Sequence, residues 1–494
     1  MLRHRWSAPA FRFGMALAPA LGTAAGLLTS ALVTLLLPGC ASFSPDAGMG
    51  AVNSIAAAEL KKDALKIDGE EAAAAGRARV RRLLASTLPV DAAVQIALLN
   101  NKGLQAAYNE LGIAEAAMVE ASLPPNPAFA ISRLSTSVEL DIERRIVGDI
   151  LALATLPVRA NIAADRFHQA QLRAAEETLR VAAEARRNYY RAVASRQLAT
   201  FLSKASSAAE TAAKLAKQLG ETGAMNKLDQ AREQSFYVDV ATQLIAARQH
   251  AASEREALIR SLGLWGNEIE FKLPEMLPAV PRRPMSLPAV EMDAVRRRVD
   301  LQIARIEVDT LAKSYGLTNA TRFINLLDVA GVSRTQREAG GARGTGGGVE
   351  VEFQVPVFDL GEVRLRQAGE SYAHAVNRLT EKAVNVRSEA RDTYAAYRST
   401  YDIALRYRDQ ALALRQTITE ETLLRYGAMQ IDVFTLLTEA RQRVAVNIAA
   451  IEAQRDFWLA STNLGAAVAG GGVAAGGGAI SSAAVRASGV TASE

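Results

Sequence analysis

Alternating apolar and polar residues near position 350 predict a strand that leads into a very long helix. Residues 349–355 alternate valine or phenylalanine with glutamate or glutamine, the period of two expected of a strand with one apolar face. Beyond Pro356, apolar or small residues recur about every 3.5 residues as far as Tyr426, the spacing of a coiled-coil seam. The pattern then breaks and resumes as a second helix that we expect to end near Gly465. The prediction is a strand, a long helix, a tight turn and a shorter returning helix.

The same order of elements occurs earlier in the chain. A strand-like segment at residues 150–156 ends at Pro157, and residues 158–219 contain neither glycine nor proline. We expect the returning helix to end at Gly263, as the later one ends at Gly465. The two turns share one tripeptide, found at Gly223, Ala224 and Met225 and again at Gly427, Ala428 and Met429. Three landmarks in one order at nearly one spacing indicate that the chain is two copies of one unit.

Each copy is expected to contain a helix, two strands, a long helix and a returning helix. In the first copy we expect a helix over residues 90–122, with strands over 136–143 and 150–156. In the second copy we expect a helix over 289–315 and a strand over 322–333, followed by a glycine-rich surface loop over 340–348. The predicted segments of the whole chain are a signal peptide (1–39), a lipidated and loosely packed N-terminal arm (40–89), the first repeat (90–263), a proline-rich linker (264–288), the second repeat (289–465) and a disordered Gly/Ala-rich tail (466–494).

The helix lengths predict a rod. A helix over residues 159–219 would be roughly 90 Å long at 1.5 Å per residue, which is too long for a compact domain. The returning helix is only about two-thirds as long. However, the returning helix and the helix that opens the same repeat together nearly equal the long one. We therefore expect two short helices to stack end to end beside each long helix.

The strands favour a membrane barrel. Their apolar positions alternate with Glu, Asp and Gln, which indicates lipid on one face and water on the other. Four strands cannot close a barrel alone, and an unpaired sheet edge in lipid costs several kcal/mol for each backbone group. On this interpretation the chain associates with copies of itself. The alternative is that the strands form small soluble hairpins that cap a coiled coil.

The N-terminus has the pattern of a secretory signal. Three arginines precede an apolar, uncharged run over residues 15–37, and the chain's single cysteine, Cys40, follows Pro38 and Gly39. This position matches a bacterial lipoprotein, in which the cysteine becomes the acylated first residue. Ala41 is compatible with sorting to the outer membrane. The alternatives are a buried structural cysteine or a transmembrane anchor.

Charge and composition exclude several classes of function. Removing residues 1–39 takes away three arginines and no acid, so the net charge falls from +5 to about +2, and no nucleic-acid partner is implied. The four histidines are scattered along the chain, and neither a catalytic cluster nor a metal-ligand cluster is present in the sequence. No glycine-rich phosphate loop stands between a strand and a helix. We therefore expect no enzymatic activity, no cofactor and no metal.

These residues resemble one family, the outer-membrane efflux proteins of the TolC type. The resemblance rests on the duplicated unit, on the segment Leu123–Pro127 that enters the first strand, on Val355–Glu362 where a strand passes into a helix, and on the glycine turn followed by an acid at Gly223 and Asp229. In the second copy Asp432 comes one residue sooner after its glycine. The resemblance implies a mainly α fold with a small β part, in which a trimer combines a long α-helical coiled-coil barrel with a transmembrane β-barrel of four strands per chain and twelve in all.

The resemblance also implies a function. Similar proteins are passive exit ducts that conduct substrates across the outer membrane from an inner-membrane pump and a periplasmic adaptor. The two Gly-Ala-Met turns would then lie at the periplasmic tip and dock the adaptor. Asp229 and Asp432 would be favoured by the helix N-terminus, or would serve as gate acids that help close the tunnel. The alternative function is a lipid-anchored periplasmic adaptor or a structural coiled-coil protein.

Overall fold

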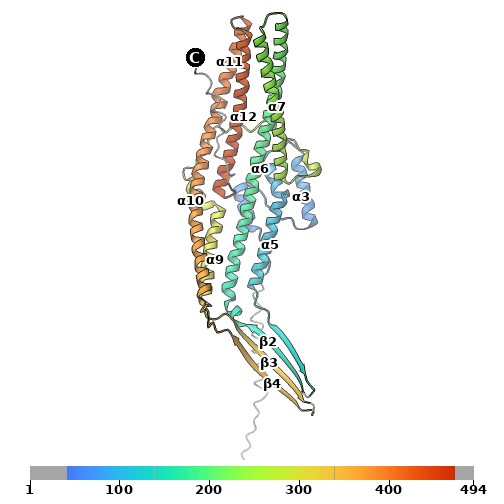
Figure 1. Ribbon diagram of the computed structural model, residues 1–494, viewed down its shortest axis with the longest axis vertical. Coiled ribbons are helices and arrows are strands. Elements are labelled where there is room, and N and C mark those ends of the chain that lie inside the picture. The colour runs from blue at the N-terminus through green and yellow to red at the C-terminus, as the bar shows by residue number, and fades with distance from the viewer. Residues whose placement is uncertain (1–41, 138, 339, 473–494) are drawn as a thin grey trace, which may run out of the picture.

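The computed structural model describes residues 42–472 except Val138 and Ala339. The chain forms a long rod, with a β-sheet at one end and two helical hairpins that reach the other (Figure 1). Most of the described residues are helical, and the β part is small, as the sequence predicts. Within the described part of the chain, none of the helices combines the length and the apolar character needed to cross a bilayer.

Each repeat is built around one long helical column. In the first repeat the 72-residue helix α6 (Ile150–Glu221) turns back into the 36-residue helix α7 (Lys227–Leu262). In the second, α10 (Glu362–Arg406), the π-helical turn η2 (Tyr407–Ala411) and α11 (Leu412–Gly427) form a continuous column that turns back into α12 (Val433–Ala469). At 1.5 Å per residue α6 is about 108 Å long.

Two shorter helices lie end to end beside each long column, and this prediction is confirmed. Along α6, the lower part packs against α5 (Lys102–Ser122) and the upper part against α7 (Figure 1). In the second repeat, α9 (Val299–Ala320) lies along α10, and α12 lies along both α10 and α11. Each long column is therefore accompanied by a second helix over most of its length.

The two repeats contribute one hairpin each to a single sheet. Its order is β1 (Ala128–Ser135), β2 (Glu139–Asp149), β3 (Leu327–Glu338) and β4 (Arg343–Phe353), and all neighbours are antiparallel. The central pair β2–β3 joins the repeats. Among the described residues, β1 and β4 are the edges of this sheet.

The predicted strand boundaries are partly wrong. Residues 136–143 contain the turn between β1 and β2, where the backbone N–H of Thr136 donates to the carbonyl of Glu139. Residues 150–156 begin α6, because the Asp149 side chain accepts from the N–H of Ala152 at 2.7 Å and caps the helix. Pro157 therefore lies inside α6. A short apolar run fits a strand or a buried helix equally well, and here the cap decides for the helix.

The second hairpin also differs from its prediction. The strand expected over residues 322–333 begins and ends later, as β3. Most of the segment 340–348, expected as a surface loop, is the first half of β4, while the alternation over 349–353 is confirmed. Glycine lowers strand propensity but does not prevent pairing, and here the pairing with β3 determines the structure.

Several helix boundaries differ as well. The helix expected over residues 90–122 breaks at Asn101, which caps α5 and separates it from α4 (Val90–Asn100). The helix expected over 289–315 breaks at Arg298 between α8 (Val290–Arg297) and α9. Gly263 ends α7 in a left-handed conformation, with φ of 68°, but Gly465 lies within α12, which ends at Gly470 with φ of 104°.

The N-terminal arm, expected to be loosely packed with some helix, contains helices as expected but packs partly against the core in its described residues, 42–89. These residues form α2 (Gly50–Leu60) and α3 (Gly69–Leu84), and they bury Val52, Ala56 and Val80. The buried side chains belong to the main core, which also contains much of α4 and the middle of α6. The N-terminal arm is therefore part of the packed middle of the rod.

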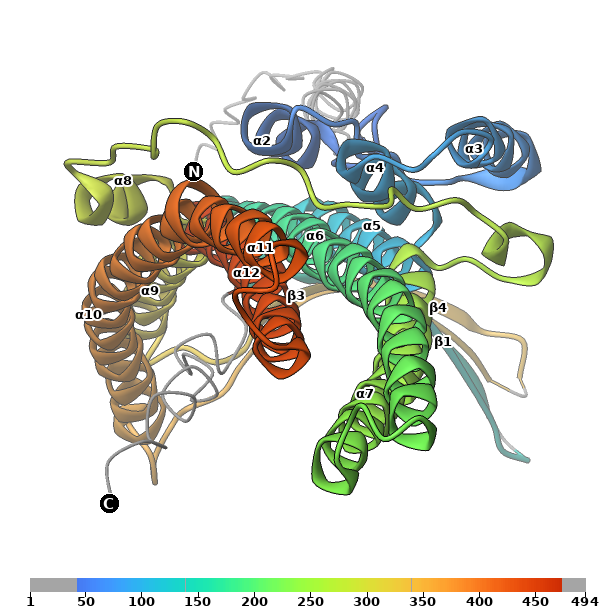
Figure 2. The same cartoon turned by 90° about the horizontal axis from the view of Figure 1, so that it is seen from above.

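The linker between the repeats is tied to the middle of the rod. It follows α7 through the short 3₁₀ turn η1 (Gly266–Ile269) and crosses the outside of the helical wall to reach α8 (Figure 2). The Pro278 carbonyl accepts from Trp458 Nε1 at 2.9 Å, and the Leu277 N–H donates to Gln197 Oε1 at 2.9 Å. Proline has no backbone N–H with which to continue a helix or a sheet. Backbone polar groups of this segment are instead paired with side chains of the long helices.

Candidate functional site

The two predicted turns lie together at the end of the rod opposite the sheet (Figure 1). In the first turn, Gly223 adopts a left-handed conformation with φ of 75°, which favours glycine. In the second turn, Gly427 is the last residue of α11 and is not left-handed; Met429 takes that conformation instead, with φ of 57°. The prediction that both glycines supply the reversal is thus right for Gly223 and wrong for Gly427.

The tip residues of the two turns are mostly exposed. Gly223, Ala224, Gly427 and Ala428 are exposed, Met225 is half-buried, and the Met429 side chain is 94% exposed. A flexible thioether adapts to uneven apolar surfaces. The tip thus presents small residues and methionine to its surroundings.

The two candidate gate acids occupy different positions in their helices. Asp432 is the N-cap of α12 and accepts from the Thr435 N–H at 2.9 Å and from the Thr435 hydroxyl at 2.6 Å. These hydrogen bonds lower the pKa of Asp432. In α7 the N-cap is Asn226, and Asp229 lies in the first turn with its N–H donating to Asn226. Both carboxylates are therefore stabilised by a helix N-terminus, and Asp432 corresponds in position to Asn226 rather than to Asp229.

A cleft separates the two tips. Its walls carry residues from both turns and from the first helical turns of α7 and α12, including Met225, Asp229, Met429, Asp432 and Phe434. The hairpins diverge at this end (Figure 2), so both candidate gate acids line a single cleft.

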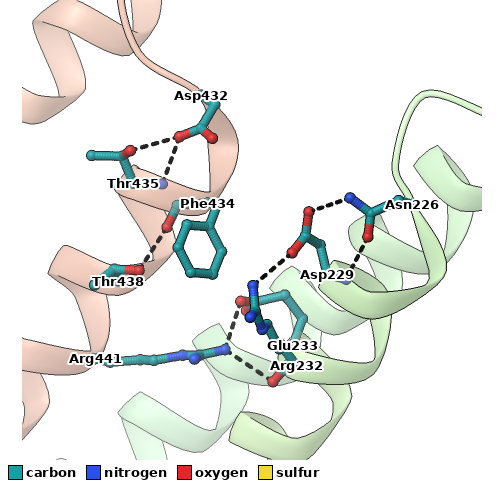
Figure 3. A network of polar contacts seen from close by, with 9 residues as sticks. All are labelled: Asn226, Asp229, Arg232, Glu233, Asp432, Phe434, Thr435, Thr438 and Arg441. Atoms are coloured by element: carbon teal, nitrogen blue, oxygen red, sulfur yellow. Dashed lines mark hydrogen bonds and ion pairs between the residues drawn. The ribbon is translucent and has the colours of Figure 1, made fainter. Parts of the chain in front are cut away.

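One ion pair joins the hairpins beneath this cleft. The guanidinium of Arg441 on α12 donates to a carboxylate oxygen of Glu233 on α7 at 2.7 Å and to the Arg232 carbonyl at 2.9 Å (Figure 3). The Glu233 side chain is 2% exposed and that of Arg441 is 29% exposed. Burial raises the pKa of Glu233, and the positive charge of Arg441 opposes this increase only in part.

Two cation–π contacts flank the ion pair. The guanidinium of Arg232 lies 5.1 Å from the ring centroid of Phe434 on the opposite hairpin, and that of Arg441 lies 4.9 Å from the Phe236 ring. The sequence analysis missed Glu233 and Arg441. An acid four residues after Asp229 looks like part of a solvated helix face, and only the approach of the second hairpin buries it.

The sheet at the other end of the rod has two chemically distinct faces. Directly paired residues on neighbouring strands point to the same face, and successive residues along one strand point to opposite faces. The register therefore places Phe129, Ile146, Val349 and Val351 on one face. The eight carboxylates of the described strands all lie on the other face: Glu139, Asp141, Glu143, Asp149, Asp328, Glu338, Glu350 and Glu352.

Cys40, the predicted lipidation site, and the predicted signal peptide lie outside the described residues. In the part of the chain that the structure describes, three or more His, Cys, Asp or Glu side chains nowhere gather closely enough to hold a metal ion.

The fold is that of solved outer-membrane channels. The Campylobacter jejuni CmeC outer membrane channel is 15% identical, with a TM-score of 0.65 over 85% of this chain and 92% of that chain. The outer membrane protein VceC of Vibrio cholerae is 14% identical, with a TM-score of 0.63 over 78% and 96%. The Neisseria gonorrhoeae MtrE outer membrane channel in its open state is 16% identical, with a TM-score of 0.61 over 77% and 89%.

At these identities the likeness shows the fold alone. No protein-family model matches the sequence, and no curated protein matches it. The predicted resemblance to outer-membrane efflux proteins of the TolC type is confirmed at the level of the fold.

Proposed function

We propose that this chain is the outer-membrane exit duct of a tripartite efflux or secretion system and passively conducts substrates delivered by a pump and an adaptor. One observation carries the proposal: a sheet with an apolar face and an acidic face lies at one end of a rod whose other end holds two paired helical tips. The similar solved structures are outer-membrane channels. The contribution of both repeats to one sheet favours a duct over a periplasmic adaptor or a structural coiled coil.

The working form that we propose is a homotrimer. Each chain offers two sheet edges, β1 and β4, whose unpaired backbone groups would each cost several kcal/mol in lipid. Pairing β4 of one copy with β1 of the next removes both edges. Three chains of four strands close a barrel of twelve strands, which lies within the range of outer-membrane barrels.

The helical tips are the proposed docking site for a periplasmic adaptor. They lie farthest from the sheet, so they would reach toward the inner membrane when the sheet is in the outer one. The docking residues proposed in each chain are Gly223, Ala224, Met225, Gly427, Ala428 and Met429. Their small side chains suit close approach by another helical hairpin. The contact between Glu233 and Arg441 would hold the tips together in the closed duct, and Asp229 and Asp432 would add negative charge at its mouth.

A lipid on Cys40 would add a second anchor in the outer membrane of a Gram-negative bacterium. Acyl chains contribute about 0.8 kcal/mol for each buried CH₂. The sequence supports this proposal because only a few residues separate Cys40 from the packed N-terminal arm. The barrel and the acyl chains would then hold the chain at the same membrane surface.

Planar-bilayer recording on the purified chain tests the proposal. We expect trimers in detergent, measured by light scattering, and stepwise ionic conductance after reconstitution. Photo-crosslinkers placed at Ala224 and Ala428 should capture a cognate adaptor. A monomer without conductance would contradict the exit duct and favour the alternative, a periplasmic adaptor or a structural coiled coil. Labelling of both positions by an extracellular reagent would place the tips on the wrong side of the membrane.

A further inference from the structure

Four arginines lie on the apolar face of the sheet, in the half of the sheet farther from the helices, with Arg337 and Arg343 in its last row, Arg133 one row inward and Arg144 two rows inward. The register places them on this face together with Phe129, Val349 and Val351. The four residues, here called the arginine belt, are Arg133, Arg144, Arg337 and Arg343. All four are exposed. The belt therefore adds positive charge to the half of this face that also carries Ser135, Ser333, Thr335 and Thr345, whereas the half nearer the helices is apolar.

The arginine belt differs from the arginines on the opposite face. On the acidic face, Arg145 pairs with Glu350 at 3.0 Å and Arg334 pairs with Asp141. No ion pair involves a belt arginine within the described residues, because the carboxylates of the described strands all lie on the other face. The positive charge of the belt is therefore not balanced by the described strands, and a group outside the sheet is needed to balance it.

Two members of the belt oppose each other directly. Arg337 on β3 pairs across the strands with Arg343 on β4, and like charges directly opposite one another destabilise a sheet. A third arginine, Arg144, donates to the hydroxyl of Thr335 at 3.4 Å. Thr335 lies one row closer to the hairpin turns, so the Arg144 side chain leans toward the rest of the belt. An anion held between these guanidinium groups would remove their repulsion.

The height of the last row of the belt, which holds Arg337 and Arg343, matches one surface of a bilayer. Ten residues separate Phe353 from Arg343 along β4, which is about 34 Å at 3.4 Å per residue. With a strand tilt of about 40°, this becomes about 26 Å along the membrane normal, close to the 25 Å apolar band of outer-membrane barrels. If Phe353 lies at one membrane surface, Arg337 and Arg343 lie at the other, where lipid phosphates are found.

We propose that the arginine belt binds the phosphate groups of lipid A, the diphosphorylated glycolipid of the outer leaflet. The proposal rests on the proposed function, because it needs the sheet to be in the outer membrane. A planar guanidinium binds phosphate oxygens through two parallel hydrogen bonds. The apolar rows below the belt contact the acyl chains of the same lipid. Lipid A therefore matches both parts of this surface, whereas free phosphate matches only the arginines.

Native mass spectrometry of the full chain in an uncharged detergent tests the proposal, with lipid A as the titrant. Each basic residue near an anionic lipid surface changes the affinity about fivefold. We expect Arg337→Gln to weaken binding about fivefold, and the triple change of Arg133, Arg337 and Arg343 to glutamine to weaken it about a hundredfold. Replacement of the same three residues by lysine, which keeps the charge but not the paired donors of a guanidinium, should restore only part of the affinity.

The matched control is Arg334→Gln, three residues away on the acidic face. It should leave lipid A affinity unchanged. Equal loss from Arg334→Gln and Arg337→Gln would overturn the proposal, as would unchanged binding by the triple glutamine variant. Inorganic phosphate that competes as well as lipid A would also overturn it. Conductance and trimer mass, measured on the same preparations, separate failure of the belt proposal from failure of the proposed function. A conducting trimer that prefers lipid A no more than phosphatidylcholine refutes only the belt proposal. A monomer without conductance refutes both.

Discussion

Removing Arg441 should open the tip far more than removing its partner Glu233. In Arg441→Met the Glu233 side chain, which is 2% exposed in the wild type, loses its cation, and its charge can be relieved only by taking up a proton or by meeting water when the hairpins separate. Glu233→Gln removes the charge together with the need to pair it. This asymmetry follows because an unpaired buried charge costs more than the pair contributes.

The expected magnitude follows from burial. Breaking a fully buried pair by removing one partner costs about 3–5 kcal/mol. The Arg441 side chain is 29% exposed, so water already reaches part of the contact, and we expect about 2 kcal/mol. That energy shifts the ratio of closed to open tips roughly 30-fold. The double variant with methionine at both positions should return close to the wild-type ratio, because two apolar side chains of similar volume replace the pair.

Single-channel recording measures this ratio directly as the open fraction. The control is Arg415→Met, whose partner Glu439, at 2.8 Å, lies in the same hairpin; its loss should leave opening unchanged. An open fraction in Arg441→Met equal to that of Glu233→Gln would refute the burial argument. If the effects of Glu233→Met and Arg441→Met simply add in the double variant, the two residues do not interact.

The raised pKa of Glu233 fixes the sign of a pH effect at the tip. Burial in the closed tip raises this pKa above the value of a hydrated glutamate, so the closed state binds the proton more tightly than the open state. Lowering the pH from neutral through the raised pKa should therefore favour closure. Glu233→Gln should abolish this response in the same recordings, and wild-type opening that rises on acidification would contradict it.

Three further results are expected. Val351→Arg, two residues from Phe353 and therefore near one membrane surface, should impair trimer assembly by about 1 kcal/mol, whereas Glu352→Arg, on the opposite face, should assemble and alter conductance; assembly is measured from heat-resistant trimers in gels and conductance in planar bilayers. Cys40→Ser should abolish incorporation of labelled palmitate, and unchanged labelling would contradict the lipoprotein assignment. Gly223→Ala should lower the free energy of unfolding by about 1 kcal/mol because φ is 75°, whereas Gly427→Ala, at the last residue of α11, should raise it by about 0.5 kcal/mol at most, because glycine costs most in the middle of a helix; both are measured by thermal unfolding.

The long-range plan of the fold could be predicted from the sequence because repetition and helix length are visible in it. The shared tripeptides at Gly223 and Gly427 located both helix reversals, and the uninterrupted run after Pro157 located α6. The stacking of α5 and α7 followed from lengths alone. Periodicity over tens of residues averages out local exceptions such as Pro157.

The local details could not be predicted in the same way, because tertiary contacts decide them. Strand pairing makes a strand of the glycine-rich start of β4, and one cap at Asp149 makes a helix of a short apolar run expected to be a strand. The sequence singled out Asp432 as a residue favoured by a helix N-terminus, and the structure shows it as the N-cap of α12. The bridge between Glu233 and Arg441 joins residues 208 positions apart, and no pattern within either helix indicates that they meet.

Packing along the rod differs in a way that suits a duct whose tip can move. Near the middle, Tyr190 of α6 stacks on Trp458 of α12, with ring centroids 5.2 Å apart, and Phe457 packs against Tyr397 and Tyr401. The contact between Tyr190 and Trp458 joins the two repeats, and Phe457 packs against the same Trp458. Separation of the repeats there would expose these rings to water. At the tip the repeats meet through one ion pair, cation–π contacts and a cleft, and below these Val444 and Ile448 of α12 pack against an apolar cluster on α6 and α7. Water can replace the polar contacts at lower cost than the aromatic ones. The hairpins can therefore separate at the tip while the middle of the rod and the sheet keep the repeats together.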